Sequence, residues 1–167
     1  MKIALLGTGF GQAHAAVYAQ RSDVDEVVVF GRTPEKLAKI SGLFGFATTT
    51  DLDAVITDPS VDLVDICLPT RLHAEIAVRA MQAGKDVLIE LPLATTLSDA
   101  HRIVEAQQAT GRRAFVDMFS RSARPTSTYA RRWPSSGTGR CRCWRSRAAP
   151  RCCGRATTSA CRAWRWT

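Results

Sequence analysis

Glycines are concentrated in the stretch LLGTGFGQAH, directly after the first apolar run of the chain. The part of it that could contact a phosphate group comprises Gly7, Thr8, Gly9, Phe10 and Gly11. One glycine permits a tight turn after a strand, and the next lets backbone amides approach a pyrophosphate at the N-terminus of the following helix. The usual third glycine would be residue 12, which is Gln12 here, so an ordinary strand-to-helix turn is the alternative. A second strand at the expected distance favours dinucleotide binding.

The stretch VVVFGRTPEKL contains that second strand and carries Arg32 and Thr33 where NAD-binding sites usually have an acidic residue. Such a carboxylate binds the ribose 2′-hydroxyl of NAD and would repel the 2′-phosphate of NADP. Without it, Arg32 can bind the phosphate through charge-assisted hydrogen bonds. We therefore predict NADP(H) as the cofactor, with NAD(H) as the alternative. The alternative is that Arg32 has no ligand and is a solvated turn residue before the N-terminus of a helix.

Short apolar runs alternate with longer segments of helical period, as in βαβ units around a parallel sheet. The runs span residues 2–6, 26–30, 62–68, 86–91 and 113–119. One predicted helix ends at Gly84, and another begins at Thr96, buries Ile103 and Val104, and ends at Gly111. Right-handed crossovers then predict an α/β fold with a doubly wound (Rossmann) parallel sheet, of strand order 3-2-1-4-5-6.

Two further stretches, CLPTRLHAE and IELPLATT, follow later strands at the edge where open α/β sheets bind their ligands. Together with GTGFGQAH and VDMFSR, they resemble the Gfo/Idh/MocA family of NAD(P)-dependent oxidoreductases, which includes glucose-fructose oxidoreductase and inositol 2-dehydrogenase. The resemblance covers residues 1 to about 121 and implies an NAD(P)-binding domain over 1–121. It also implies hydride transfer between the cofactor and a sugar- or cyclitol-like hydroxyl.

The resemblance extends the candidate cofactor site to the nicotinamide side of the cleft. The residues that it places there or close by are Leu68, Pro69, Thr70, His73, Glu90 and Pro92. Two of them have structural alternatives, because His73 could pack or cap the start of its helix and Glu90 could pair with a neighbouring cation.

The family's usual Glu-Lys-Pro motif is Glu90-Leu91-Pro92 in this chain. The resemblance implies that the family lysine contacts the nicotinamide ribose and the substrate and assists proton transfer. Leu91 supplies neither a hydrogen-bond donor nor a charge. We therefore assign no catalytic residue and expect a chain that binds its cofactor without being catalytically competent.

The charge of the chain is divided unevenly. Residues 1–120 hold 11 Lys and Arg with all 15 Asp and Glu, whereas 121–167 hold 12 Arg and no acid. The segment 122–167 also has no Leu, Ile, Val, Phe or Met, but it has five of the six cysteines and all four tryptophans. Because such a composition cannot build a packed core, we predict a disordered basic tail. Such a composition is typical of a GC-rich gene translated out of frame. We therefore interpret the tail as a frameshift product that stands in place of the family's substrate-binding and oligomerisation domain.

Other interpretations of the tail stay open. Arginine with interleaved tryptophan could bind nucleic acid, which would make the chain a non-catalytic nucleotide-binding or nucleic-acid-associating protein. The cysteines lack the paired C-x-x-C spacing of structural zinc sites, so we predict no metal site. No run approaches the roughly 18 apolar residues of a membrane span, and the first apolar run is too short for a secretory signal, so a cytoplasmic protein without a membrane partner is expected.

Overall fold

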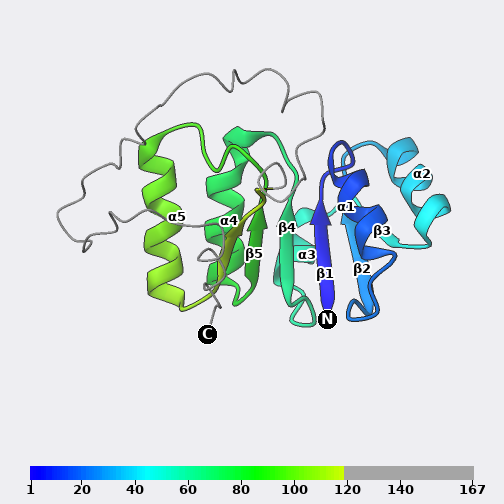
Figure 1. Ribbon diagram of the computed structural model, residues 1–167, viewed down its shortest axis with the longest axis horizontal. Helices are drawn as coiled ribbons and strands as arrows, with labels where there is room; N and C mark the ends of the chain where they lie inside the picture. The colour runs from blue at the N-terminus through cyan, green and yellow to red at the C-terminus, as the bar shows by residue number, and fades with distance from the viewer. Residues whose placement is uncertain (119–167) are drawn as a thin grey trace, which may run out of the picture. The chain divides into compact units, whose positions relative to one another are not determined.

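A computed structural model describes residues 1–118, and the predicted tail lies outside these described residues. Six parallel strands form one sheet: β1 (Lys2–Leu6), β2 (Glu26–Phe30), β3 (Ala47–Thr49), β4 (Leu63–Ile66), β5 (Asp86–Ile89) and β6 (Ala114–Val116). Their order, β3-β2-β1-β4-β5-β6, confirms the predicted doubly wound sheet. Figure 1 shows this sheet with β1 near its middle.

The helices connect the strands in the alternation that the sequence predicts. They are α1 (Gly11–Tyr18), α2 (Pro34–Phe44), α3 (Leu52–Thr57), α4 (His73–Gln82) and α5 (Leu97–Thr110), with a 3₁₀ turn at Thr70–Leu72. The short β3 and α3 had no individual prediction. Because β3 is an edge strand of sequence Ala-Thr-Thr with largely exposed side chains, it lacks the apolar run by which the other strands are found.

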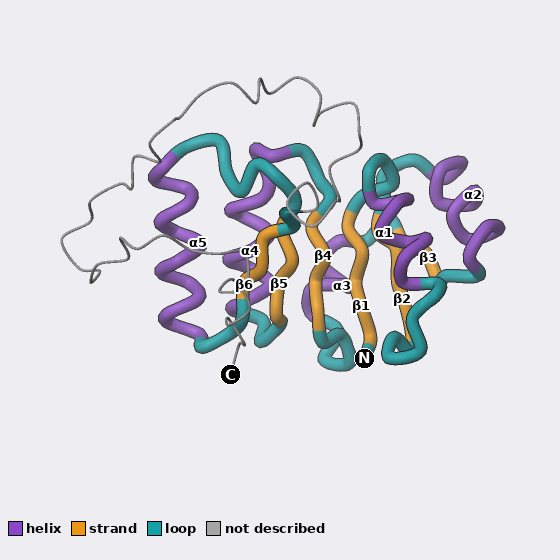
Figure 2. The backbone as a smooth tube through the Cα atoms, viewed as in Figure 1, coloured by secondary structure: helices purple, strands orange, loops and turns teal. Residues whose placement is uncertain are grey.

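The two faces of the sheet bury separate sets of apolar side chains. On one face, α1 and α2 pack against β1 and β2 around Ile3, Leu5 and Val29. On the other face, α3, α4 and α5 pack against side chains such as Ile66 and Ile89. Figures 1 and 2 show α4 and α5 side by side, and the two helices contact each other. The glycine-rich stretch connects β1 to α1, so the packing of α1 against the sheet fixes its position.

The ends of α5 follow the predicted signals, but one core assignment is wrong. The Thr96 side chain accepts a hydrogen bond from the Asp99 amide, and Gly111 adopts a left-handed conformation after the last turn. Ile103 is buried as predicted, whereas Val104 is 44% exposed. Successive helical residues differ by about 100° in direction, so a helix packed on one side buries Ile103 and turns its neighbour toward solvent.

No helix within residues 1–118 is long and apolar enough to cross a membrane.

Candidate functional site

A cavity of about 350 Å³ lies at the carboxyl ends of β1, β2 and β4. The residues predicted from the sequence that line it are Gly7, Thr8, Gly9, Arg32, Thr33, Leu68 and Pro69. A second cavity of about 350 Å³ shares Cys67 and Leu68 with the first and is also lined by Phe10, Glu90 and Leu91. The two cavities therefore adjoin, and the cleft extends from Arg32 at one end to Leu91 at the other.

The glycine-rich loop has the geometry that a dinucleotide needs. Gly7 has a φ of +119°, and a Cβ there would lie 2.4 Å from the carbonyl oxygen of Cys67. A Cβ on Gly9 would meet nothing within 4 Å, so its backbone is open to a ligand.

No side chain caps the start of α1, and no acid lies in its first turn. The N–H groups of Gln12 and Ala13 donate to the carbonyl oxygens of Gly9 and Phe10, whereas those of Phe10 and Gly11 have no hydrogen-bond acceptor within the described residues. The N–H groups of Phe10 and Gly11 are thus available to a pyrophosphate, and the residues present fit the cofactor.

The opposite end of the first cavity is basic. Arg32 and Lys36 both line it, and neither pairs with an acidic side chain within the described part of the chain. Lys36 was not predicted as a site residue. The sequence signal was present, because a residue in the first turn of the helix after the second strand lies close to the loop that carries Arg32.

His73 lies behind the cleft rather than in its wall. It is buried, with Nδ1 3.0 Å from the carbonyl oxygen of Pro92 and Nε2 2.7 Å from that of Leu68. The ring therefore ties the loop after β4 to the segment after β5. Gly11, Thr70 and Pro92 also line neither cavity.

A buried polar network that was not predicted from the sequence lies at the inner wall of the cleft. The Nδ1 atom of His14 is 2.7 Å from Oδ2 of Asp65, and its Nε2 atom is 3.0 Å from Oε1 of Glu90 and 3.3 Å from Oδ2 of Asp117. Tyr18 donates a hydrogen bond of 2.6 Å to Asp65, which is fully buried. The sequence signal for this network was Asp65, an acid inside the otherwise apolar strand β4, because a buried carboxylate needs a polar partner.

These contacts favour the protonated form of His14. Hydrogen bonding to Asp65, followed by the charges of Asp65 and Glu90, raises the pKa of His14 to about 9 despite burial of the ring. Burial and the charge of Asp65 also raise the pKa values of Tyr18 and Cys67, so both stay protonated at neutral pH.

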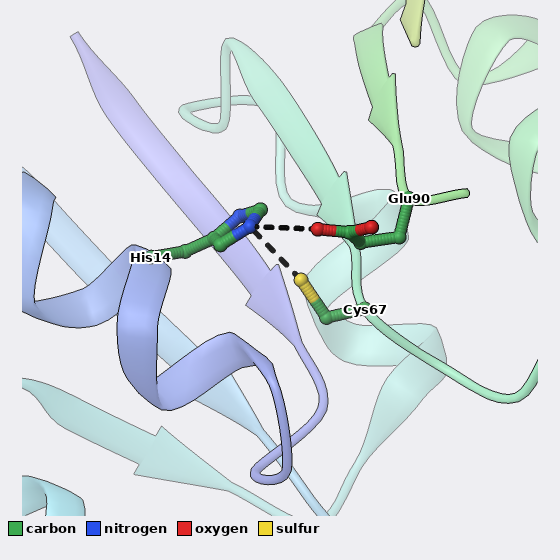
Figure 3. A group of neighbouring side chains, drawn as sticks. All are labelled: His14, Cys67 and Glu90. Atoms are coloured by element: carbon green, nitrogen blue, oxygen red, sulfur yellow. Dashed lines mark hydrogen bonds and ion pairs between the residues drawn. The ribbon is translucent and has the colours of Figure 1, made fainter. Parts of the chain in front are cut away.

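His14, Cys67 and Glu90 have the donor types of a metal site, and their ligand atoms lie within 4.8 Å of one another (Figure 3). However, the Cys67 sulfur lies 3.5 Å from Nδ1 of His14, whereas Glu90 faces Nε2. An ion bound to Nδ1 would lie on the side of Cys67, and an ion bound to Nε2 would lie on the side of Glu90. The other two residues therefore do not face the same imidazole nitrogen. The arrangement instead suits an imidazolium that donates to carboxylates on both sides.

The pKa of His14 predicts how stability depends on pH. Since the folded value of about 9 exceeds the ordinary 6.5, the stabilisation is complete below about pH 6.5 and is lost as pH rises through about 9. We expect a decrease of about 3 kcal/mol in the free energy of unfolding, measured by urea titration at pH 6 and pH 10. His14→Gln should remove this component, and an equal loss in both proteins would contradict the prediction.

Comparison with known proteins places this geometry in a family. The family model described as "Oxidoreductase family, NAD-binding Rossmann fold" matches residues 1–118. A 4-carboxy-2-hydroxymuconate-6-semialdehyde dehydrogenase from Sphingobium sp. is 37% identical over 113 residues, covering 66% of this chain and 36% of that protein. Levoglucosan dehydrogenase from Pseudarthrobacter phenanthrenivorans is 36% identical over 117 residues, covering 64% and 30% respectively.

The fold is similar to that of biliverdin reductase from Synechocystis sp., solved with biliverdin and NADP+. The TM-score is 0.67 at 30% sequence identity, and the match covers 71% of this chain and 38% of that one. The matched region spans about a third of the length of the curated relatives. Because the family model covers the whole described sheet and its glycine-rich loop, the chain belongs to the Gfo/Idh/MocA oxidoreductase family through its NAD-binding Rossmann domain.

Proposed function

We propose that this chain binds a nicotinamide dinucleotide along the cleft from Arg32 to Leu91, with NADP(H) preferred over NAD(H). The open backbone at Gly9 and the uncapped start of α1 support a pyrophosphate position beside the glycine-rich loop. The adenosine end would lie toward Arg32 and the nicotinamide end toward Glu90 and Leu91.

The observation that carries the NADP(H) preference is the pair of cations at the adenosine end. Arg32 and Lys36 line one cavity that contains no acidic side chain. A 2′-phosphate there would gain charge-assisted hydrogen bonds, whereas the 2′-hydroxyl of NAD would find no carboxylate.

Titration of the chain with NADPH and NADH tests this preference. NADPH should bind about 10- to 100-fold more tightly, because hydrogen bonds to charged groups contribute about 1.5 to 3 kcal/mol. Arg32→Ala should remove most of the difference and Lys36→Ala part of it, without weakening NADH binding. Lys39→Ala is the matched control, since Lys39 is also an exposed lysine of α2 but does not line the cavity. Equal affinities of the unaltered chain for both cofactors would refute the preference.

The chemistry for which such a nucleotide domain is suited, when a substrate-binding domain completes it, is hydride transfer: NADP+ would accept a hydride from the carbon of a sugar- or cyclitol-like hydroxyl, and NADPH would donate one to the corresponding carbonyl. The similarity to levoglucosan dehydrogenase supports that substrate class. In this chain, Leu91 occupies the lysine position, and Glu90 accepts hydrogen bonds from His14 and from the Leu91 amide. We therefore propose a nucleotide-binding domain, spanning residues 1–121, that holds the cofactor without catalytic turnover.

A further inference from the structure

Three neighbouring strands end in a row of ionisable side chains. Ile66 pairs with Ile89, and Ile89 pairs with Val116, so the residues that follow them lie side by side. Those residues are Cys67, Glu90 and Asp117. Continued strand-like hydrogen bonds from the Glu90 amide to Ile66 and from the Asp117 amide to Ile89 keep them in register. The sheet therefore brings two carboxylates and a thiol together at one edge.

The same row includes the first glycine of the cofactor loop. Leu6 pairs with Ile66, which places Gly7 beside Cys67, and a Cβ on Gly7 would collide with the Cys67 carbonyl. The row of acids thus directly adjoins the turn that the dinucleotide must contact. A movement of β4 and β5 relative to α1 would change the shape of the cleft.

His14 is the cation that faces this row. Its side chain is 8% exposed, and it contacts Asp65 from the interior of β4, Glu90 from the end of β5 and Asp117 from the end of β6. Within residues 1–118, no lysine or arginine forms an ion pair with any of these three carboxylates. Figure 3 shows the ring reaching from α1 toward the strand ends.

His14 is also coupled to the start of α1. It lies in the turn that follows Gly11, and its ring packs edge-on against Phe10 at a centroid distance of 5.6 Å. On the far side, its ring lies edge-on to Tyr18 at 6.4 Å. The imidazole therefore joins Phe10, the N-cap residue of α1, to three strands, whose acidic groups would otherwise repel one another.

We propose that protonated His14 is a positioning residue of the cofactor cleft, whose charge holds the glycine-rich loop and the start of α1 against the ends of β4, β5 and β6. This inference rests on the proposed function, because its consequence is the affinity for the dinucleotide. His14 does not line the cavity of the glycine-rich loop and acts through the groups that it fastens. The ionisable groups that face it are Asp65, Cys67, Glu90, Asp117 and Tyr18.

The first experiment measures NADPH affinity of the full chain with His14→Gln. We expect the dissociation constant to rise at least tenfold at pH 7, because glutamine keeps hydrogen-bonding capacity but supplies no charge. His101→Gln is the matched control, since His101 is exposed on α5 and lines neither cavity of the cleft. The secondary structure of each variant is checked by circular dichroism.

The second experiment is a pH profile, which a merely structural histidine would not change. NADPH affinity of the unaltered chain should decrease as pH rises through about 9, where His14 loses its proton. Asp117→Asn removes one carboxylate from the row and should move the midpoint of this decrease to lower pH. His14→Gln should show no decrease in NADPH affinity at the pH where His14 loses its proton. The ring resonances of His14 in the cofactor-free chain report the same midpoint by NMR.

The outcomes separate the inference from the function on which it rests. If NADPH binds with the same affinity and pH profile in His14→Gln as in the unaltered chain, the positioning role is wrong and the cofactor site stands. A cofactor-free His14 midpoint near 6.5 would also overturn it. If neither dinucleotide binds at any pH, the proposed function fails and this inference fails with it.

Discussion

Gly7→Ala is expected to lower the free energy of unfolding by about 3 to 5 kcal/mol and to abolish dinucleotide binding. The φ of +119° at Gly7 is strained for any residue with a side chain, at a cost of about 1 to 3 kcal/mol. A methyl group would also lie 2.4 Å from the Cys67 carbonyl oxygen, and relieving such an overlap in a packed region costs about 1 to 3 kcal/mol more. Urea denaturation followed by circular dichroism measures the change.

Two other glycines provide controls for that effect. Gly42 lies within α2 with nothing near its Cβ position, so Gly42→Ala should leave stability unchanged or raise it by up to about 1 kcal/mol. Gly9→Ala should also fold normally, since a Cβ there meets no protein atom, but it should weaken NADPH binding by occupying the approach to the pyrophosphate. Unchanged stability of Gly7→Ala would show that the turn tolerates a side chain and would contradict the structural role assigned to Gly7.

No detectable oxidation or reduction of polyols, sugars or inositols is the second expected result, even with saturating NADP or NADPH. Hydride transfer requires a group that moves the proton of the substrate hydroxyl, and loss of that assistance typically costs about 10²- to 10⁴-fold in rate. Leu91 cannot supply it, and Glu90 is engaged by His14. Loss of substrate positioning would cost several further orders of magnitude.

Substitution at position 91 tests the origin of the inactivity. Leu91→Lys places an ammonium beside the second cavity, which Leu91 lines with a side chain that is 47% exposed. We expect no recovery of turnover in this chain, because a lysine alone does not position a substrate. Turnover that co-purifies with the chain through two columns and disappears in Gly9→Asp would refute the expected inactivity.

Local patterns were sufficient to predict five of the six strands, the glycine turn and the family. The apolar run Lys2–Leu6 followed by Gly7 identifies a strand and its turn, because both depend on residues adjacent in the chain. The missing acid after β2 also led to the prediction of a phosphate partner for Arg32, which stays a prediction. The edge strand β3 was not found, since its short polar sequence gains its conformation from pairing with β2 rather than from its own pattern.

The contacts of individual site residues depended on the tertiary structure. His14 lies 51 residues from Asp65 and 76 from Glu90 in the sequence, and only the register of the parallel sheet brings these groups together. Similarly, the carbonyl groups on both sides of His73 come from segments that meet only after β4 and β5 have paired. Residue types and spacing thus determined which nucleotide-binding fold this chain adopts. Packing of distant segments brought the carboxylates around His14 that raise its pKa, because a pKa depends on the burial and charges that folding brings around a group.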